Sequence, residues 1–158
     1  MVHDTVTDTV IEGNAPDIRR LVGIARRENN KKRKYLVVNR FQGKHVPVSA
    51  SDAFLMFEAL ARTVETEYKE ERLLLVGFAE TATAIGAALA VSLHTAYIQT
   101  TREEIEGVEY IFFSESHSHA TQQKLVKSDL DLAVNQIDRI LFVEDEVTTG
   151  NTILNIID

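Results

Sequence analysis

The sequence predicts an α/β fold with a mainly parallel sheet, and three observations support this prediction. Residues 73–76 and 140–143 are continuous apolar runs that indicate strands, and the first run has the pattern of a parallel strand covered on both faces. Segments between them carry apolar residues at helical spacing. Short turn-forming stretches separate the two kinds of segment. Strands that alternate with helices are typical of α/β folds, which bind ligands at the carboxyl ends of their strands.

The composition is that of an ordinary globular protein. The 158 residues are 44% hydrophobic and 26% charged, enough for one domain with its own core. The net charge of −7 and a single short basic cluster at residues 26–34 argue against nucleic acid as a partner. Without cysteine, disulfides, thiolate metal sites and cysteine nucleophiles are excluded. No apolar run suits a signal peptide or a membrane span, so we expect a cytoplasmic protein without a membrane partner.

The N-terminal third of the sequence predicts an arm, a helix, a strand and a loop. Residues 1–14 are polar and aperiodic, which predicts a loose arm, so the domain proper would span residues 15–158. Pro16 and the apolar residues that follow it predict a short amphipathic helix ending near Asn30. Residues 35–38 are β-rich and predict a buried strand. Gly43 and Pro47 then indicate an irregular loop.

The remainder alternates between helices and strands. Ser51 is the expected cap of a helix with a buried stripe formed by Phe54, Phe57, Leu60, Ala61 and Val64. The segments that follow, in order, are predicted as a strand at 73–77, a helix at 81–93, strands at 95–100 and 109–113, a polar and mobile stretch at 114–123, a helix at 125–136 and a strand at 140–143.

The strongest chemical signal follows the last strand. Glu144 and Asp145 follow its apolar residues and so lie at the end of the strand. A turn rich in Thr and Gly comes next, and a helix begins there. Backbone amides at a helix start bind phosphate, and threonine hydroxyls add donors. The carboxylates would repel a phosphate but would accept hydrogen bonds from sugar hydroxyls. A sugar phosphate therefore matches both the acidic pair and the turn that follows it. The alternative is a strand, turn and helix that is acidic and Thr-rich without a function. The turn residues are Thr148, Thr149, Gly150, Asn151 and Thr152.

Residues 140–152 resemble the signature that binds phosphoribosyl diphosphate (PRPP) in type I phosphoribosyltransferases. The match comprises the apolar strand, the acidic pair, a short link and the Thr-Thr-Gly-x-Thr loop. The resemblance implies that Glu144 and Asp145 contact the ribose hydroxyls and that residues 148–152 hold the 5′-phosphate. Glu146 departs from the pattern, since an aliphatic residue usually stands there.

The resemblance also implies a loop that receives pyrophosphate after an earlier strand. Residues 77–86 fit it, because small residues at a helix start expose backbone amides. Glu80 is unexpected there, since a carboxylate repels pyrophosphate unless Mg²⁺ lies between them. We expect Mg²⁺ as the cofactor, held mainly through the ligand rather than by a protein metal site. The loop's central residues are Phe78, Ala79, Glu80, Thr81 and Ala82.

A third element implied by the resemblance is a loop that closes over the reacting centre. Residues 114–123 occupy this interval, and His117 or His119 would touch pyrophosphate or the nucleophile. One alternative is an inert, solvated loop. A transition-metal site is less favoured, because the two histidines have no nearby acidic or cysteine partner.

Residues 35–48 and 116–121 further resemble the orotate-phosphoribosyltransferase-like proteins of bacterial tellurite-resistance and stress gene clusters. In the same loop as Gly43, Lys44 and His45 could line an acceptor pocket or have no role.

The reaction implied is transfer of ribose 5-phosphate between pyrophosphate and a nitrogenous base. A non-catalytic PRPP-binding regulator and an unrelated phosphosugar-binding protein are the alternatives. Because the chain stops soon after residues 148–152, we expect the sheet to be incomplete at the C-terminus. A homodimer, a longer parent chain or a complementing C-terminal segment would then cover the strand at 140–143, which would otherwise be an exposed edge.

Overall fold

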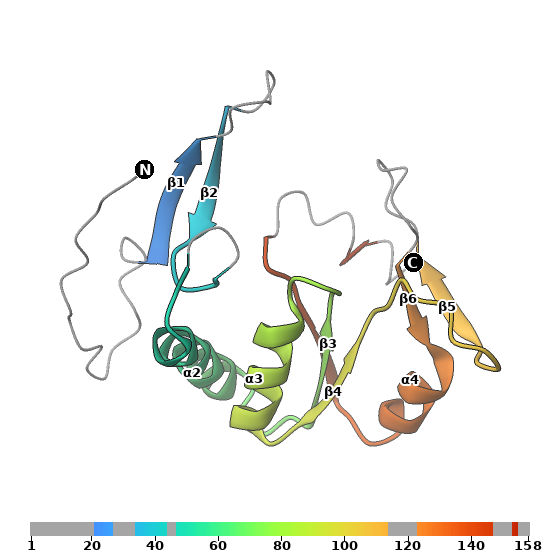
Figure 1. Cartoon of the computed structure of the whole chain (residues 1–158). Helices are drawn as coiled ribbons and strands as arrows, with labels where there is room; N and C mark the ends of the chain where they lie inside the picture. Colours follow the sequence, from blue (N-terminus) through green and yellow to red (C-terminus); the bar gives the residue numbers. More distant parts are fainter. Residues whose placement is uncertain (1–20, 27–33, 44–46, 114–122, 147–152, 155–158) are drawn as a thin grey trace. The chain divides into compact units, whose positions relative to one another are not determined.

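The computed structural model describes residues 21–26, 34–43, 47–113, 123–146 and 153–154 (Figure 1). The chain divides into two compact units, residues 1–59 and 60–158, and the division falls inside helix α2 (Ala50–Glu67). None of the helices in these ranges combines the length and the apolar composition that a bilayer span requires.

The first unit contains an antiparallel pair of strands, β1 (Val22–Arg26) and β2 (Tyr35–Asn39). Ile24 lies opposite Val37, and the amide of Arg40 donates to the carbonyl of Leu21 at 2.8 Å. The helix predicted through residues 22–26 is therefore wrong. Its apolar residues also alternate as in a strand, and pairing with β2 satisfies their backbone groups in the extended form.

The strand predicted at residues 35–38 is confirmed as β2, but only in part as a buried strand. Val38 is buried, whereas Tyr35 is 60% and Val37 52% exposed. Successive side chains on a strand point to opposite faces, so β2 buries one face and exposes the other to solvent. The described part of the following loop is irregular as predicted, and Gly43 adopts a positive φ of 73° there.

Helix α2 begins one residue earlier than its predicted cap. The hydroxyl of Ser49 accepts from the amide of Asp52 at 3.1 Å and donates to its carboxylate at 2.6 Å. Ser49 is therefore the cap, and the assignment to Ser51 is wrong, because the Ser49 side chain accepts from the amide three residues later, as a cap does, and Ser51 lies inside the helix. The predicted stripe holds for Phe57 and Ala61, which are buried, and fails for two members that are more than a third exposed, Phe54 and Leu60.

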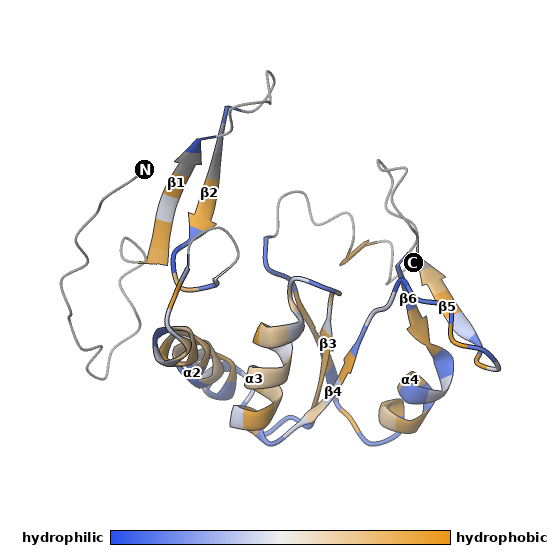
Figure 2. Ribbon diagram, in the orientation of Figure 1, coloured by the Kyte–Doolittle hydropathy of each residue, from blue (hydrophilic) through white to orange (hydrophobic). Residues whose placement is uncertain are grey.

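The second unit is built on a parallel sheet in the order β4-β3-β7, which confirms the predicted fold class. Strand β3 (Leu73–Gly77) lies between β4 (Ala96–Gln99) and β7 (Arg139–Val143), and every residue of β3 is buried. In Figure 2 this strand has the colour of hydrophobic residues, and its burial makes it part of the core of this unit. A strand with two neighbours and two covered faces requires the continuous apolar run seen in the sequence.

Helix α3 (Thr83–Leu93) packs against β3 and β4 (Figure 1). Two glycines make room for the ring of Tyr97 between the helix and the sheet. A Cβ atom on Gly77 would lie 2.5 Å from the Tyr97 hydroxyl, and one on Gly86 would lie 2.5 Å from the ring. Partial burial raises the pKa of the Tyr97 hydroxyl, which donates to the Thr83 carbonyl at 3.4 Å. The absence of a side chain at Gly77 and Gly86 therefore allows the helix and the sheet to pack closely around this ring.

Strands β5 (Tyr110–Phe113) and β6 (Gln123–Val126) form a separate antiparallel pair, followed by α4 (Lys127–Val134). Strand β6 was not predicted: residue 123 was placed in a polar, mobile stretch and residues 125–126 in the next helix. Both assignments are wrong. Gln123 and Lys124 are each 2% exposed, because specific partners in the rest of the unit compensate the burial of their polar groups.

Strand β7 has β3 as its one hydrogen-bonded neighbour among the described strands. Ile153 and Leu154 have helical backbone, as predicted for the segment after the phosphate loop. The prediction that a partner or a further segment covers the other edge of β7 stays a prediction.

The starts of β3 and β7 are joined by an ion pair that predicts a pH dependence of stability. Arg72 donates from its side chain to both carboxylate oxygens of Asp138, at 2.8 and 3.0 Å, and from its backbone amide at 2.9 Å. The side-chain and backbone hydrogen bonds from Arg72 hold the pKa of Asp138 well below its ordinary value. A lowered pKa in the folded state stabilises the protein above the ordinary carboxyl pKa, and this contribution is lost as the pH falls through the folded value.

We therefore expect Asp138→Asn to lower the melting temperature at pH 7. The difference from the original chain should shrink below about pH 4, the ordinary range of aspartate titration. Thermal unfolding followed by circular dichroism across pH 2–8 measures this. A difference that stays constant with pH would contradict the assignment.

Candidate functional site

Two chain segments leave the sheet side by side at its carboxyl edge. Gly77 and Val143 are register partners in the parallel pair of β3 and β7. The pairing continues one step further, since the amide of Phe78 donates to the carbonyl of Val143 at 3.1 Å. The loop of residues 78–82 and the acidic segment of residues 144–146 therefore begin from neighbouring points.

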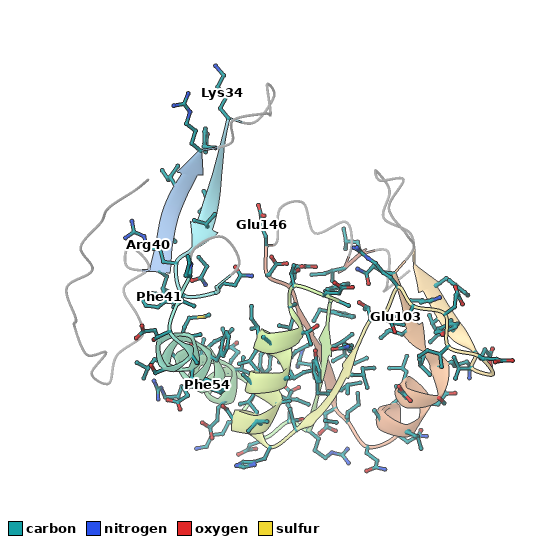
Figure 3. All side chains as sticks on the ribbon, in the orientation of Figure 1. Lys34, Arg40, Phe41, Phe54, Glu103 and Glu146 are labelled. Atoms are coloured by element: carbon teal, nitrogen blue, oxygen red, sulfur yellow. The ribbon has the colours of Figure 1, made fainter. Side chains whose placement is uncertain are left out.

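A side-chain hydrogen bond joins these two segments. The hydroxyl of Thr81 donates to Oδ1 of Asp145 at 2.6 Å. Glu144 and Asp145 are partly buried, and the amide of Asp145 donates to the Glu144 carboxylate at 3.2 Å. Glu146 is exposed where the chain leaves the strand (Figure 3). The structure thus brings together the acidic pair and the predicted pyrophosphate loop, which lie far apart in the sequence.

The backbone of the 78–82 loop has both occupied and available amides. Besides the amide of Phe78, that of Ala79 donates to the Thr100 hydroxyl at 2.8 Å, and that of Ala82 to the Phe78 carbonyl at 3.1 Å. The amides of Glu80 and Thr81 make no hydrogen bond with the part of the chain that the structure describes. Of the five predicted loop residues, these two can offer backbone donors to a ligand.

The side chains of the loop divide in the same way. Phe78 is 2% exposed and its ring packs on Phe142, with centroids 6.1 Å apart. Ala79 and Ala82 are also buried, whereas Glu80 and Thr81 are exposed. The loop also contains a cis peptide bond between Ala79 and Glu80. Phe78, Ala79 and Ala82 therefore anchor the loop in the core, and the middle two residues face outward.

Two residues that the sequence did not single out support the loop from beneath. Thr100 follows the end of β4 and Gln123 opens β6, and both are almost completely buried. The Thr100 hydroxyl bonds to the Gln123 carboxamide at 2.6 Å, and Nε2 of Gln123 donates to the carbonyl of Ala79 at 2.8 Å. Thr100 could have been suspected from its position at the carboxyl end of a predicted strand. No local signal marks Gln123.

The arrangement suits a hard cation only when a ligand shares the coordination. Within the described ranges, no group of three or more histidine, aspartate or glutamate residues could hold a metal ion. Mg²⁺ in proteins is commonly bound by one or two carboxylates together with phosphate oxygens. Glu80 and Asp145 are carboxylates of this kind at the loop and the acidic segment, so the donor set fits a magnesium ion carried by a phosphorylated ligand.

Several predicted site residues lie outside the described residues. They are the two histidines of the predicted closing loop and the complete phosphate-binding turn, together with two residues of the N-terminal loop: His117, His119, Thr148, Thr149, Gly150, Asn151, Thr152, Lys44 and His45.

Comparison with known proteins identifies the family. The family model described as phosphoribosyl transferase matches residues 21–158, which is most of the chain. Curated proteins give no match. The matched range includes the loop at 78–82, the acidic segment and the predicted phosphate-binding turn. Because the match extends over more than half of the sequence, the chain belongs to the phosphoribosyl transferase family.

Proposed function

We propose that the protein transfers ribose 5-phosphate between PRPP and a nitrogenous base, with pyrophosphate as the leaving group in the forward direction. The hydrogen bond between Thr81 and Asp145 carries this proposal. It places a loop with available amides against an acidic segment at the carboxyl edge of a parallel sheet, where α/β proteins bind ligands. PRPP needs both features, since it carries pyrophosphate at one end of a ribose with two free hydroxyls.

The loop would hold the pyrophosphate. The amides of Glu80 and Thr81 would donate to its oxygens, on which negative charge accumulates as the anomeric bond breaks. Mg²⁺, when bound with the ligand, would supply further charge neutralisation at these oxygens. The ion would also offset the repulsion between the Glu80 carboxylate and the pyrophosphate.

The acidic pair would hold the sugar. Carboxylates accept charge-assisted hydrogen bonds from hydroxyls, so Glu144 and Asp145 would orient the ribose by its two free hydroxyls. Their charge would also favour the positive charge that develops on the ring as pyrophosphate departs. By resemblance, residues 148–152 would bind the 5′-phosphate, and His117 or His119 would approach the pyrophosphate or the attacking base.

A non-catalytic PRPP-binding regulator is the second candidate, and the exposed Glu80 favours it. A carboxylate in the middle of the loop weakens pyrophosphate binding in the absence of Mg²⁺. A regulator would bind PRPP without supporting exchange of its pyrophosphate. An assay of transfer of labelled pyrophosphate into PRPP, with a panel of purine and pyrimidine nucleotides and Mg²⁺, separates the two candidates.

We expect PRPP to bind with Mg²⁺ and to stabilise the fold, because a ligand that binds only the folded state raises its stability. Isothermal titration calorimetry with PRPP, ribose 5-phosphate and pyrophosphate, each with and without Mg²⁺, tests this. PRPP should bind more tightly than ribose 5-phosphate, and Mg²⁺ should strengthen PRPP and pyrophosphate binding. Equal affinities for PRPP and ribose 5-phosphate would instead indicate a general phosphosugar-binding protein.

A further inference from the structure

We propose that Thr100 and Gln123 are positioning residues for the pyrophosphate end of the site, and that their buried hydrogen bonds hold in place the backbone that carries the available loop amides. The inference rests on the proposed function, because it assigns pyrophosphate to the 78–82 loop. Neither residue is expected to touch the ligand. Thr100 is 0% and Gln123 2% exposed, and both act through the backbone of Ala79.

The donors and acceptors of this network allow one arrangement of protons. The carbonyl of Ala79 can only accept, so the nitrogen of the Gln123 carboxamide must face it. The carboxamide oxygen then faces Thr100 and must receive the hydroxyl proton. The hydroxyl oxygen remains free to accept from the amide of Ala79, as observed at 2.8 Å. Every polar group in the network is therefore satisfied in a single orientation.

The network also fixes the backbone from which the exposed part of the loop extends. Gln123 holds the carbonyl of Ala79, directly before the exposed residues Glu80 and Thr81. Thr100 holds the preceding peptide unit through the Ala79 amide, at 2.8 Å. The amide and the carbonyl of Ala79 are thus both held, one by the side chain of Thr100, which follows β4, and the other by a side chain of β6.

The network is sensitive to substitution because it is buried. Leaving a buried donor or acceptor without its partner costs more free energy than the hydrogen bond itself contributes, because water does not reach the group to replace the partner. In Thr100→Val the Ala79 amide and the Gln123 carboxamide oxygen would both lack a partner. The loop would then move until these groups find new partners, which would displace the exposed residues Glu80 and Thr81 from their positions in the site.

Thr95 provides a matched control on the opposite edge of the sheet. Its hydroxyl donates to the backbone carbonyl of Leu73, at the start of β3. Thr95→Val therefore removes a threonine hydroxyl that bonds to the backbone far from residues 78–82. Both valine variants should lower the melting temperature. A general loss of stability can therefore be separated from a change in the site.

The test is calorimetric titration of each folded variant with pyrophosphate and Mg²⁺, and separately with ribose 5-phosphate. We expect Thr100→Val to weaken pyrophosphate binding by about tenfold or more, the effect of one lost hydrogen bond in a binding site. Ribose 5-phosphate affinity should stay within about twofold, since that ligand lacks the pyrophosphate. Thr95→Val should leave both affinities unchanged, and Thr100→Ser, which keeps the hydroxyl, should restore pyrophosphate binding.

Gln123→Met gives an independent measurement, and it replaces Thr100→Val if that variant does not fold. It removes the amide donor while keeping a side chain of similar length, and we expect the same selective loss of pyrophosphate binding. The double variant should be no weaker than the weaker single variant, because the two residues act through one network. The original chain must bind pyrophosphate first; if it does not, the proposed function fails. If it does and Thr100→Val and Gln123→Met bind as it does, the positioning role is wrong.

Discussion

Replacement of Leu75 by alanine is expected to lower the free energy of unfolding by about 2–5 kcal/mol. Leu75 lies in the middle of β3 and is 1% exposed, with Tyr97 and Leu141 as its register partners on the two neighbouring strands. The substitution removes apolar contacts and leaves a cavity that a strand held on both sides cannot close. Chemical denaturation, with the same slope against denaturant in both proteins, measures the difference.

Leu132 is the matched control for this substitution. It lies on α4 and is 74% exposed, so Leu132→Ala should change the free energy of unfolding by less than about 0.5 kcal/mol. If the two leucine variants were equally destabilised, β3 would not be the core of the second unit.

Asp145→Asn is expected to weaken PRPP binding by about 1.5–3 kcal/mol without loss of the fold. Asparagine keeps an oxygen that can accept from Thr81, the partner observed at 2.6 Å, so the link to the loop can persist. The lost quantity is the charge that strengthens the hydrogen bonds to the ribose hydroxyls. Calorimetry with PRPP and Mg²⁺ gives the change in affinity.

Glu146→Gln separates a direct contact from a general effect of charge. It removes the same charge one residue further along, at an exposed position. A general effect would make both variants bind the polyanionic PRPP more tightly, because a repulsive carboxylate is lost in each. Weaker binding in Asp145→Asn alone therefore indicates contact with the sugar, and unchanged or tighter binding in that variant would contradict it.

Strands β3 and β7 could be predicted because their own residues favour a strand. Residues 73–76 and 140–143 are apolar without interruption, and at this length such a run between turn-forming stretches favours a strand. The burial of the whole of β3 agrees with its apolar run, whereas in β7 only Val143 is buried. β1 was missed for the opposite reason. Val22 and Ala25 fit a helix together with the apolar residues before them, and they fit a strand equally well. Its partner β2 decides between the two, and the sequence of β1 alone carries no record of that pairing.

β6 was missed because its polar residues are buried by distant partners. Lys124 is 2% exposed, with its ammonium group 4.3 Å from the centre of the Tyr110 ring and paired with Glu104. A lysine in a sequence ordinarily marks a solvated position. The burial of Gln123 likewise depends on Thr100 and Ala79. Tertiary contacts of this kind override the local preference.

In the candidate site, too, the features set by local sequence could be predicted and the features set by tertiary contacts could not. The acidic pair and the 78–82 loop could be proposed from the sequence, because each follows an apolar run and carries its own chemical character. Their proximity followed from the rule that parallel strands end at one edge. The contact between Thr81 and Asp145, and the division of the loop into anchored and available amides, could not be predicted from the sequence, because they depend on strand register and on side-chain direction.

The strand order also predicts a sequence of events in folding. β3 meets β4 after one intervening helix, whereas its pairing with β7 brings Leu73 to Arg139 across most of the second unit. Contacts between residues distant in the sequence require closure of a long loop and form slowly. The segment from β3 to β4 can therefore organise before β7 arrives, but Thr81 has no Asp145 to bind until it does. Capacity to bind PRPP should consequently appear in the slowest phase of refolding, after most helical signal has returned.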